Sequence, residues 1–362
     1  MLSALTMAAP AIAPSAVSSV VSSAAQAAPG FDPLAPGVRI GGADRYETAA
    51  LIAASGWGAE AGGTVIVANG ETNGVDALSA SYLAGDRQAP ILLTRRDSVP
   101  EATAGALRQL RPSKVIVVGS DASVSAATYT QLTAGAAGER IAGEDRYATA
   151  AAIASTVADP SPGATVATVF LARGDKVGVA ADALAAAPAA YRGHIPILLT
   201  TATGLPEASR FALQHLQPAS IAVLGDYNSI DAFTISQAAG AASSYQQGRI
   251  PPINRFSGPD RSATAAAIAD SFVAREAGIG TTAAGFANGT TVDALAAGPA
   301  AGRGGFPVLL APSRDDVGEG TRRYVAEHES TLTTAYVFGD EKSLTDQALT
   351  SVRSPGYAAP VS

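Results

Sequence analysis

Short apolar runs alternate with segments of helical character along most of this chain. In the stretch that follows Arg39, apolar runs at Thr64–Ala68, Ile91–Thr94 and Val115–Val118 predict buried strands. Helices are predicted to begin near Asp44, Asp76, Pro100 and Ser125. The predicted strands start about 25 residues apart and are apolar throughout, as expected when helices cover both faces of a parallel sheet. The pattern therefore predicts an α/β fold made of right-handed βαβ units.

The same unit occurs three times. The segment 39–49, with the pattern R-x-x-G-x-D-R-x-x-T-A, recurs at 140–150 and 255–265. Three later landmarks follow each copy in the same order: a V-D-A-L helix start, a P-I-L-L strand and a V-V-G turn, with small variations. Internal repeats at a fixed spacing determine the fold, because each copy forms one structural unit. We therefore predict three tandem parallel-sheet domains over 38–138, 139–253 and 254–356.

Residues 1–37 form a leader of different composition. An apolar run over Leu2–Ala13 precedes Ala25-Gln26-Ala27, a small-x-small motif, and the leader carries a single charged residue, Asp32. This order is typical of an export signal and its cleavage site. A disordered Ala/Ser/Pro leader is the alternative interpretation. The chain has no cysteine, which fits a bacterial envelope protein that does without disulfides.

Composition excludes several classes of function. Without cysteine there is no disulfide, thiolate zinc site or cysteine nucleophile, and only three histidines are present: His194, His215 and His328. A net charge of −7 argues against a nucleic-acid-binding surface. The body of the chain has no apolar run of the ~18 residues that a membrane span needs. No catalytic or nucleotide-binding fingerprint is present, so we predict no catalytic residue, metal or cofactor.

The Asp-Arg pair of each repeat carries the most chemical information. Asp44, Asp145 and Asp260 stand where an N-cap belongs, and Arg45, Arg146 and Arg261 follow at the first helical position. A cation is unfavourable there because of the helix dipole, so each arginine is expected to meet an anion. That anion is either a carboxylate of the same protein, with Asp76, Asp182 and Asp293 as candidates, or an external polyanion. The equally repeated Arg39, Arg140 and Arg255 can serve either role.

These motifs together resemble the cell-wall-binding repeat type 2 family, over about residues 38–350. The resemblance implies three Rossmann-like domains in a pseudo-threefold arrangement. It also implies non-covalent binding to an anionic secondary cell-wall polymer at the surface of Gram-positive bacteria, as in surface-layer (S-layer) proteins. The third copy departs from the motif, with Ser262 in place of tyrosine and Phe256 in place of isoleucine.

We therefore expect a secreted, non-catalytic module that anchors a protein to the cell wall, with envelope proteins as further partners. One alternative is a wall hydrolase, because relatives with these repeats are often associated with N-acetylmuramoyl-L-alanine amidase activity. Zinc amidases need several histidine or carboxylate ligands around one metal, and three unrelated histidines favour binding over hydrolysis. A self-assembling envelope subunit is the other alternative.

Overall fold

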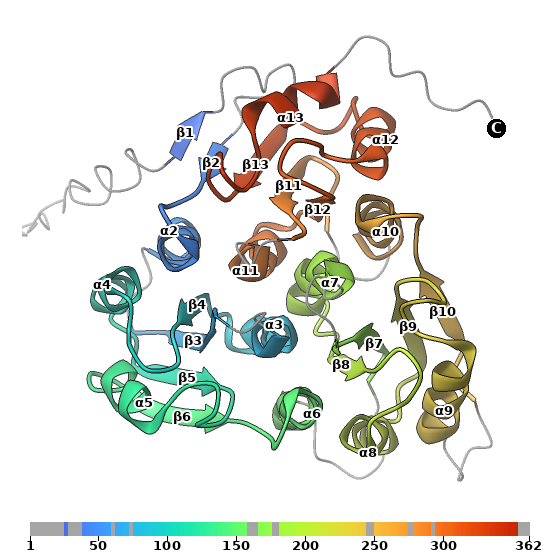
Figure 1. Ribbon diagram of the computed structural model, residues 1–362, viewed down its shortest axis with the longest axis horizontal. Helices are drawn as coiled ribbons and strands as arrows, with labels where there is room; N and C mark the ends of the chain where they lie inside the picture. The colour runs from blue at the N-terminus through green and yellow to red at the C-terminus, as the bar shows by residue number, and fades with distance from the viewer. Residues whose placement is uncertain are drawn as a thin grey trace, which may run out of the picture.

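Three α/β units surround a common centre (Figure 1). The computed structural model describes residues 25–27, 38–58, 62–71, 75–157, 166–175, 181–243, 250–273, 279–290 and 294–353. Of the predicted leader, only Ala25–Ala27 belongs to the described residues. Asp293 lies outside them. The α/β prediction is confirmed, since each unit has four parallel strands joined by helices.

The elements follow the predicted order in every unit. The first unit contains α2 (Arg45–Trp57), β3 (Thr64–Asn69), α3 (Val75–Arg87), β4 (Ile91–Thr94), α4 (Glu101–Leu110), β5 (Lys114–Val118), α5 (Ala126–Leu132) and β6 (Ala137–Ile141). The second contains α6 (Arg146–Val157), β7 (Thr168–Arg173), α7 (Ala181–Arg192), β8 (Ile197–Thr200), α8 (Glu207–Leu216), β9 (Ser220–Leu224), α9 (Ala232–Ala242) and β10 (Ile253–Phe256). The third contains α10 (Arg261–Ile268), a short π-helix (Ala269–Val273), β11 (Ala283–Asn288), α11 (Ala294–Gly304), β12 (Val308–Ala311), α12 (Glu319–Glu327), β13 (Thr334–Phe338), α13 (Asp346–Thr350) and a 3-10 turn (Ser351–Arg353).

One of the two edge strands of each four-stranded parallel sheet comes from the segment that opens the next repeat. The sheet orders are β4-β3-β5-β6 in the first unit and β8-β7-β9-β10 in the second. In the third unit the order is β12-β11-β13-β2, where β2 (Val38–Ile40) comes from the start of the first repeat. The short strand β1 (Ala25–Ala27) pairs antiparallel with the free edge of β2. The chain thus closes on itself, because its first repeat completes the sheet of its last.

The P-I-L-L strands form the core, as predicted. Ile91, Leu92 and Leu93 expose at most 1% of their surface, and the corresponding residues of β8 and β12 are equally buried. Burial on both faces explains why these strands are apolar at every position.

Helices α3, α7 and α11 meet at the centre of the molecule, where each packs against the other two (Figure 1). Each also packs against the first helix of the following unit: α3 on α6, α7 on α10 and α11 on α2. Small residues permit this close packing, since a Cβ added at Gly298 would lie 2.3 Å from the Cβ of Ala187. Across the described residues, no helix combines the length and apolar character needed to cross a membrane.

Candidate functional site

The aspartate of each repeat caps the helix that begins one residue later. Asp44 Oδ1 accepts hydrogen bonds from the backbone N–H groups of Tyr46 and Glu47, both at 2.9 Å. Asp145 and Asp260 cap α6 and α10 through single bonds of 2.8 and 2.9 Å. The predicted N-caps are therefore present in all three repeats, and they satisfy helix N–H groups that would otherwise lack a partner.

The next arginine anchors the helix start to the end of a strand. Arg45 Nη1 donates to Gly70 O at 2.6 Å, directly after β3. Arg146 makes the same bond to Gly174 O at 2.6 Å, and Arg261 bonds to Gly289 O at 2.7 Å. Within the described part of the chain, none of the three has a carboxylate within ion-pair distance. Asp76, one candidate for an internal partner, therefore forms no ion pair with Arg45, whose hydrogen bond goes to a backbone carbonyl instead.

Most of each guanidinium remains available after this bond. A guanidinium has five N–H donors, and the bond to the glycine carbonyl uses one of them. All three arginines are half-buried at the carboxyl ends of the parallel strands. Open α/β sheets bind ligands at this edge.

The other repeated arginines have a different task. Arg39, Arg140 and Arg255 lie on β2, β6 and β10, and their Nη1 atoms donate to the carbonyls of Gly339, Gly119 and Gly225. These glycines form the V-V-G turns and have φ angles of 110°, 105° and 98°, which favour glycine. Arg39 also pairs with Asp346 at 2.6 Å, and Arg140 with Asp121 at 3.1 Å. Strands β2, β6 and β10 are exchanged between repeats, since each completes the sheet of another unit. The hydrogen bonds of the three arginines hold these exchanged strands on the turn of the preceding unit.

Asp76 and Asp182 lie at the starts of the central helices, against the V-V-G turns. A Cβ added at Gly119 would lie 2.8 Å from Asp76 Oδ2, which also accepts a 3.2 Å hydrogen bond from Ser123. The positive charges that act on these carboxyls come from the following unit, Arg146 for Asp76 and Arg261 for Asp182. The structure thus brings the predicted acids and arginines together between consecutive repeats rather than within one.

Desolvation of the Asp182 carboxyl and, to a smaller extent, the neighbouring Asp226 carboxylate raise its pKa to about 7. Burial likewise raises the pKa of Asp76. Both carboxyls therefore hold a proton at a higher pH than an exposed aspartate does.

The tyrosine of the motif is replaced in the third unit for a steric reason. In the first unit, Tyr46 lies beneath the guanidinium of Arg95, which is 4.9 Å from the ring centre. In the third unit, Ser262 Oγ accepts a 3.2 Å hydrogen bond from Gly320 N at the start of α12. A Cβ added at Gly318 would lie only 2.3 Å from Ser262 Oγ. Helix α12 therefore comes too close for a tyrosine at this position, and the third unit has no ring there.

Sequence reasoning missed Arg95, which follows β4 at the same edge. Its only signal was its place directly after a P-I-L-L strand. The corresponding residues, Thr201 and Pro312, are uncharged, so the repeat comparison could not find it.

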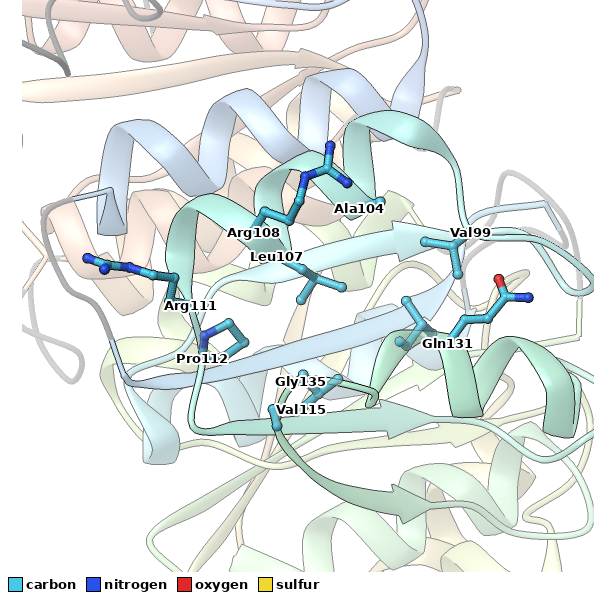
Figure 2. A pocket seen from close by; sticks show the side chains of 11 residues that line it. Val99, Ala104, Leu107, Arg108, Arg111, Pro112, Val115, Gln131 and Gly135 are labelled. Atoms are coloured by element: carbon cyan, nitrogen blue, oxygen red, sulfur yellow. The ribbon is translucent and has the colours of Figure 1, made fainter.

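An open pocket of about 530 Å³ lies away from these residues (Figure 2). It separates α4 from α5 on the outer side of the first unit, and Leu107, Arg108 and Arg111 are among its lining residues. None of the eight predicted site residues that the structure describes lines it. Among the residues that the structure describes, no cluster of three or more His, Asp or Glu side chains could hold a metal ion.

The three repeats match a known family. Three segments, 39–129, 140–235 and 255–349, match the family Cell wall binding domain 2 (CWB2). The chain belongs to the CWB2 family. This match confirms the resemblance found from the motifs. The three matched segments begin at the strand arginines Arg39, Arg140 and Arg255.

Two curated relatives come from Bacillus subtilis (strain 168). The N-acetylmuramoyl-L-alanine amidase LytC is 32% identical over 231 residues, which is 64% of this chain and 42% of LytC. The Amidase enhancer is 33% identical over 169 residues, or 47% of this chain and 22% of that protein. This CWB2 chain therefore aligns with less than half the length of either relative.

Two solved structures from Clostridium difficile have the same fold. Cwp6 matches with a TM-score of 0.71 and 28% identity, over 87% of this chain and 47% of its own. Cwp8 matches with a TM-score of 0.72 and 23% identity, over 87% of this chain and 50% of its own. The three-unit CWB2 fold is thus shared with longer proteins, and the chain is a cell-wall-binding module.

Proposed function

We propose that the three CWB2 repeats bind an anionic wall polymer together, with Arg45, Arg146 and Arg261 as the principal contacts. One observation carries this proposal. Each of these arginines occupies the same position in its unit, donates one hydrogen bond to a glycine carbonyl and forms no ion pair with the described residues. Three half-buried guanidiniums are therefore held in place with donors to spare.

The helix starts add to the attraction for an anion. Each arginine begins a helix, so the positive end of the helix dipole lies beside the guanidinium. A bound phosphate or carboxylate would interact favourably with the guanidinium, while the helix dipole offsets part of its repulsion by the capping aspartate. The protein has a net charge of −7, so attraction has to come from local groups rather than from its overall charge. Three equivalent contacts on one polymer give avidity without a tight single site.

The remaining predicted residues have supporting roles in this proposal. Arg39, Arg140 and Arg255 hold the exchanged strands, as their bonds to the turn glycines indicate. Asp76 and Asp182 set the charge opposite the arginine of the next unit, and Asp293 is assigned the same role by its place in the repeat.

We propose binding rather than hydrolysis for this chain. The relative LytC is an amidase by name, but the described residues here match a binding family over all three repeats. The leader is proposed to direct export, with the repeats then retaining the protein at the cell wall.

The arginine mechanism predicts that wall binding is sensitive to both charge and salt. Arg45→Gln, Arg146→Gln and Arg261→Gln are made singly and together and sedimented with isolated Gram-positive walls over a salt series. Each single change should weaken binding several-fold, and the triple change should remove most of it, because avidity multiplies the losses. Wild-type binding should fall as salt rises above about 0.1 M, where exposed charges are screened within ~10 Å.

Arg108→Gln is the matched control, since it removes the same charge from an exposed site on α4 that is paired with Glu101. Walls from which acid has extracted the secondary polymers should no longer bind the wild type. A triple variant that binds like the wild type would contradict the mechanism. Substitution is preferable to deleting a repeat, because each repeat supplies a strand to the sheet of another unit.

A further inference from the structure

The second repeat exposes large apolar side chains that the fold does not require. Phe211, Tyr227, Phe233 and Ile250 expose 54%, 66%, 64% and 69% of their surface, and all four belong to this repeat. Tyr227 and Phe233 both lie in or next to the connection from β9 to α9. Exposed apolar groups gathered on one element mark an interaction site more often than singly scattered ones do.

The other two repeats show what the fold needs at these positions. Aligned on the V-V-G turn, Tyr227 corresponds to Asp121 and Glu341. Aligned on the helix N-cap, Phe233 corresponds to Ala127 and Gln347. Small or polar residues therefore suffice in both sister units, and the two aromatic rings are specific to the second repeat.

The Tyr227 ring is held in a fixed position. The Arg255 guanidinium lies 4.0 Å from the ring centre and covers one face of it. Arg255 is itself bonded to the carbonyls of Gly225 and Ile230. Asp226 fixes the turn by accepting from the N–H groups of Asn228 and Ser229 at 3.1 and 2.8 Å. In the first repeat the corresponding Arg140 pairs with Asp121 and lies 4.8 Å from the ring centre of Tyr129, which is half-buried on α5. The exposed ring in the turn itself is therefore specific to the second repeat.

We infer that the β9–α9 connection is a second binding subsite, which stacks a neutral sugar ring of the wall polymer. The C–H face of a pyranose packs on a flat aromatic ring, and polar groups beside the ring can bond its hydroxyls. Asp226 and Asn228 belong to the turn that carries Tyr227, and Asp231 caps the helix that carries Phe233. Arg173, which donates to Asn228 O, is paired with Asp175. Asp226 and Asp231 together outweigh the single Arg255 cation beside the ring, so the local charge favours a neutral sugar over a phosphate or carboxylate group. This inference rests on the proposed function.

The subsite lies at the same edge as the arginines. Tyr227 follows the carboxyl end of β9, and Arg146 is bonded to Gly174 at the carboxyl end of the neighbouring strand β7. A polymer that alternates charged and neutral groups can therefore contact both. Because stacking is not an ionic contact, it persists at salt concentrations that screen the arginines.

The test replaces the two rings with a neutral polar residue, since the sister repeats have small or polar residues at these positions. Tyr227→Gln combined with Phe233→Gln is compared with wild type in wall sedimentation at about 0.1 M and about 1 M salt. At the higher salt the double variant should bind roughly tenfold more weakly than wild type, as expected for losing an aromatic anchor. Tyr227→Phe should retain wild-type binding, and N-acetylglucosamine should compete with wild type but not with the double variant. Phe211→Ala, an equally exposed ring on α8, is the control and should bind like wild type.

The outcomes separate this inference from the proposed function. If wild type fails to bind walls at the lower salt, the proposed function is wrong and the subsite falls with it. If wild type binds and the double variant matches it at both salts, the subsite is wrong and the arginine mechanism stands. If analytical ultracentrifugation shows a wild-type dimer that the double variant abolishes, the rings join two copies of the chain and the sugar assignment is overturned.

Discussion

At the residue scale, two sets of arginines with the same repetition have different roles. Both sets occur once per repeat in one short motif, so the sequence could not separate Arg39 from Arg45. The structure separates them by their acceptors: Arg39 holds a turn glycine with φ of 110°, and Arg45 holds a strand-end glycine. The N-caps and the arginines at the first helical position could be predicted because they depend on local geometry. The contact of Asp76 with the next repeat could not, since it depends on how the units pack.

Asp182 predicts a dependence of stability on pH. Burial raises its pKa from 3.8 to about 7, so the folded state binds this proton more tightly than the unfolded state does. The contribution of Asp182 to the free energy of unfolding is therefore highest below about pH 4 and falls as the pH rises toward 7. Asp182→Asn should be as stable as wild type near pH 4 and more stable by a few kcal/mol near pH 8. Denaturant unfolding from pH 4 to 8 measures this difference.

Asp97→Asn serves as the control, because the Asp97 side chain is 66% exposed and its ion pair is with the neighbouring Arg96. Its unfolding curve should differ from wild type by a small, nearly constant amount over this range. A difference between Asp182→Asn and wild type that does not change with pH would contradict the assigned ionisation.

At the element scale, the central helices depend on glycine for their close approach. A Cβ added at Gly85 of α3 would lie 2.0 Å from the backbone oxygen of Tyr191 on α7. Since a backbone atom cannot move away alone, Gly85→Ala should separate the two helices and destabilise the protein by roughly 1–3 kcal/mol. Gly56→Ala on α2 is the control, because its Cβ would meet nothing within 4 Å. It should be neutral or stabilising, as alanine is the better helix former. Thermal unfolding of the two variants gives opposite shifts if this packing is right.

The strands that sequence reasoning missed are the three exchanged ones. The longer strands were predictable because their residues are apolar on both faces. Strands β2, β6 and β10 are short and mostly half-buried or exposed, with a repeated arginine in each. A short, partly polar segment has no pattern that distinguishes a strand from a loop. Their pairing with the preceding unit is a long-range choice that no local pattern encodes.

At the scale of the whole molecule, strand exchange makes three repeats into one closed ring. Strand β2 pairs with β13, and α11 packs on α2, so the contact between the last and first units repeats that between successive units. The family resemblance predicted the threefold arrangement, but nothing in it specified where the ring closes.

Ring closure predicts that the chain tolerates circular permutation. A permutant would join Arg353 to Val38 through a flexible linker and open the chain between Ser243 and Ile250. All parallel strand pairings are kept and only the short antiparallel pairing of β1 with β2 is lost, so its unfolding temperature and wall binding should be close to those of wild type. Opening the chain inside the β13 strand instead should abolish folding, because that cut removes the partner of β2. Failure of the first permutant to fold would show that the connection between the second and third units is itself needed.

The position of β2 also imposes an order in time. Strands β6 and β10 are synthesised soon after the sheets that they complete, whereas β2 is made before every other strand of its four-stranded parallel sheet. Arg39 has to wait for Gly339, 300 residues later, before its hydrogen bond can form. An unfinished chain therefore cannot assemble the third sheet, and late closure of so long a loop is slow compared with local folding. The three proposed polymer contacts are therefore all in place only after β13 has been synthesised, so a chain that lacks β13 should have little hold on the wall.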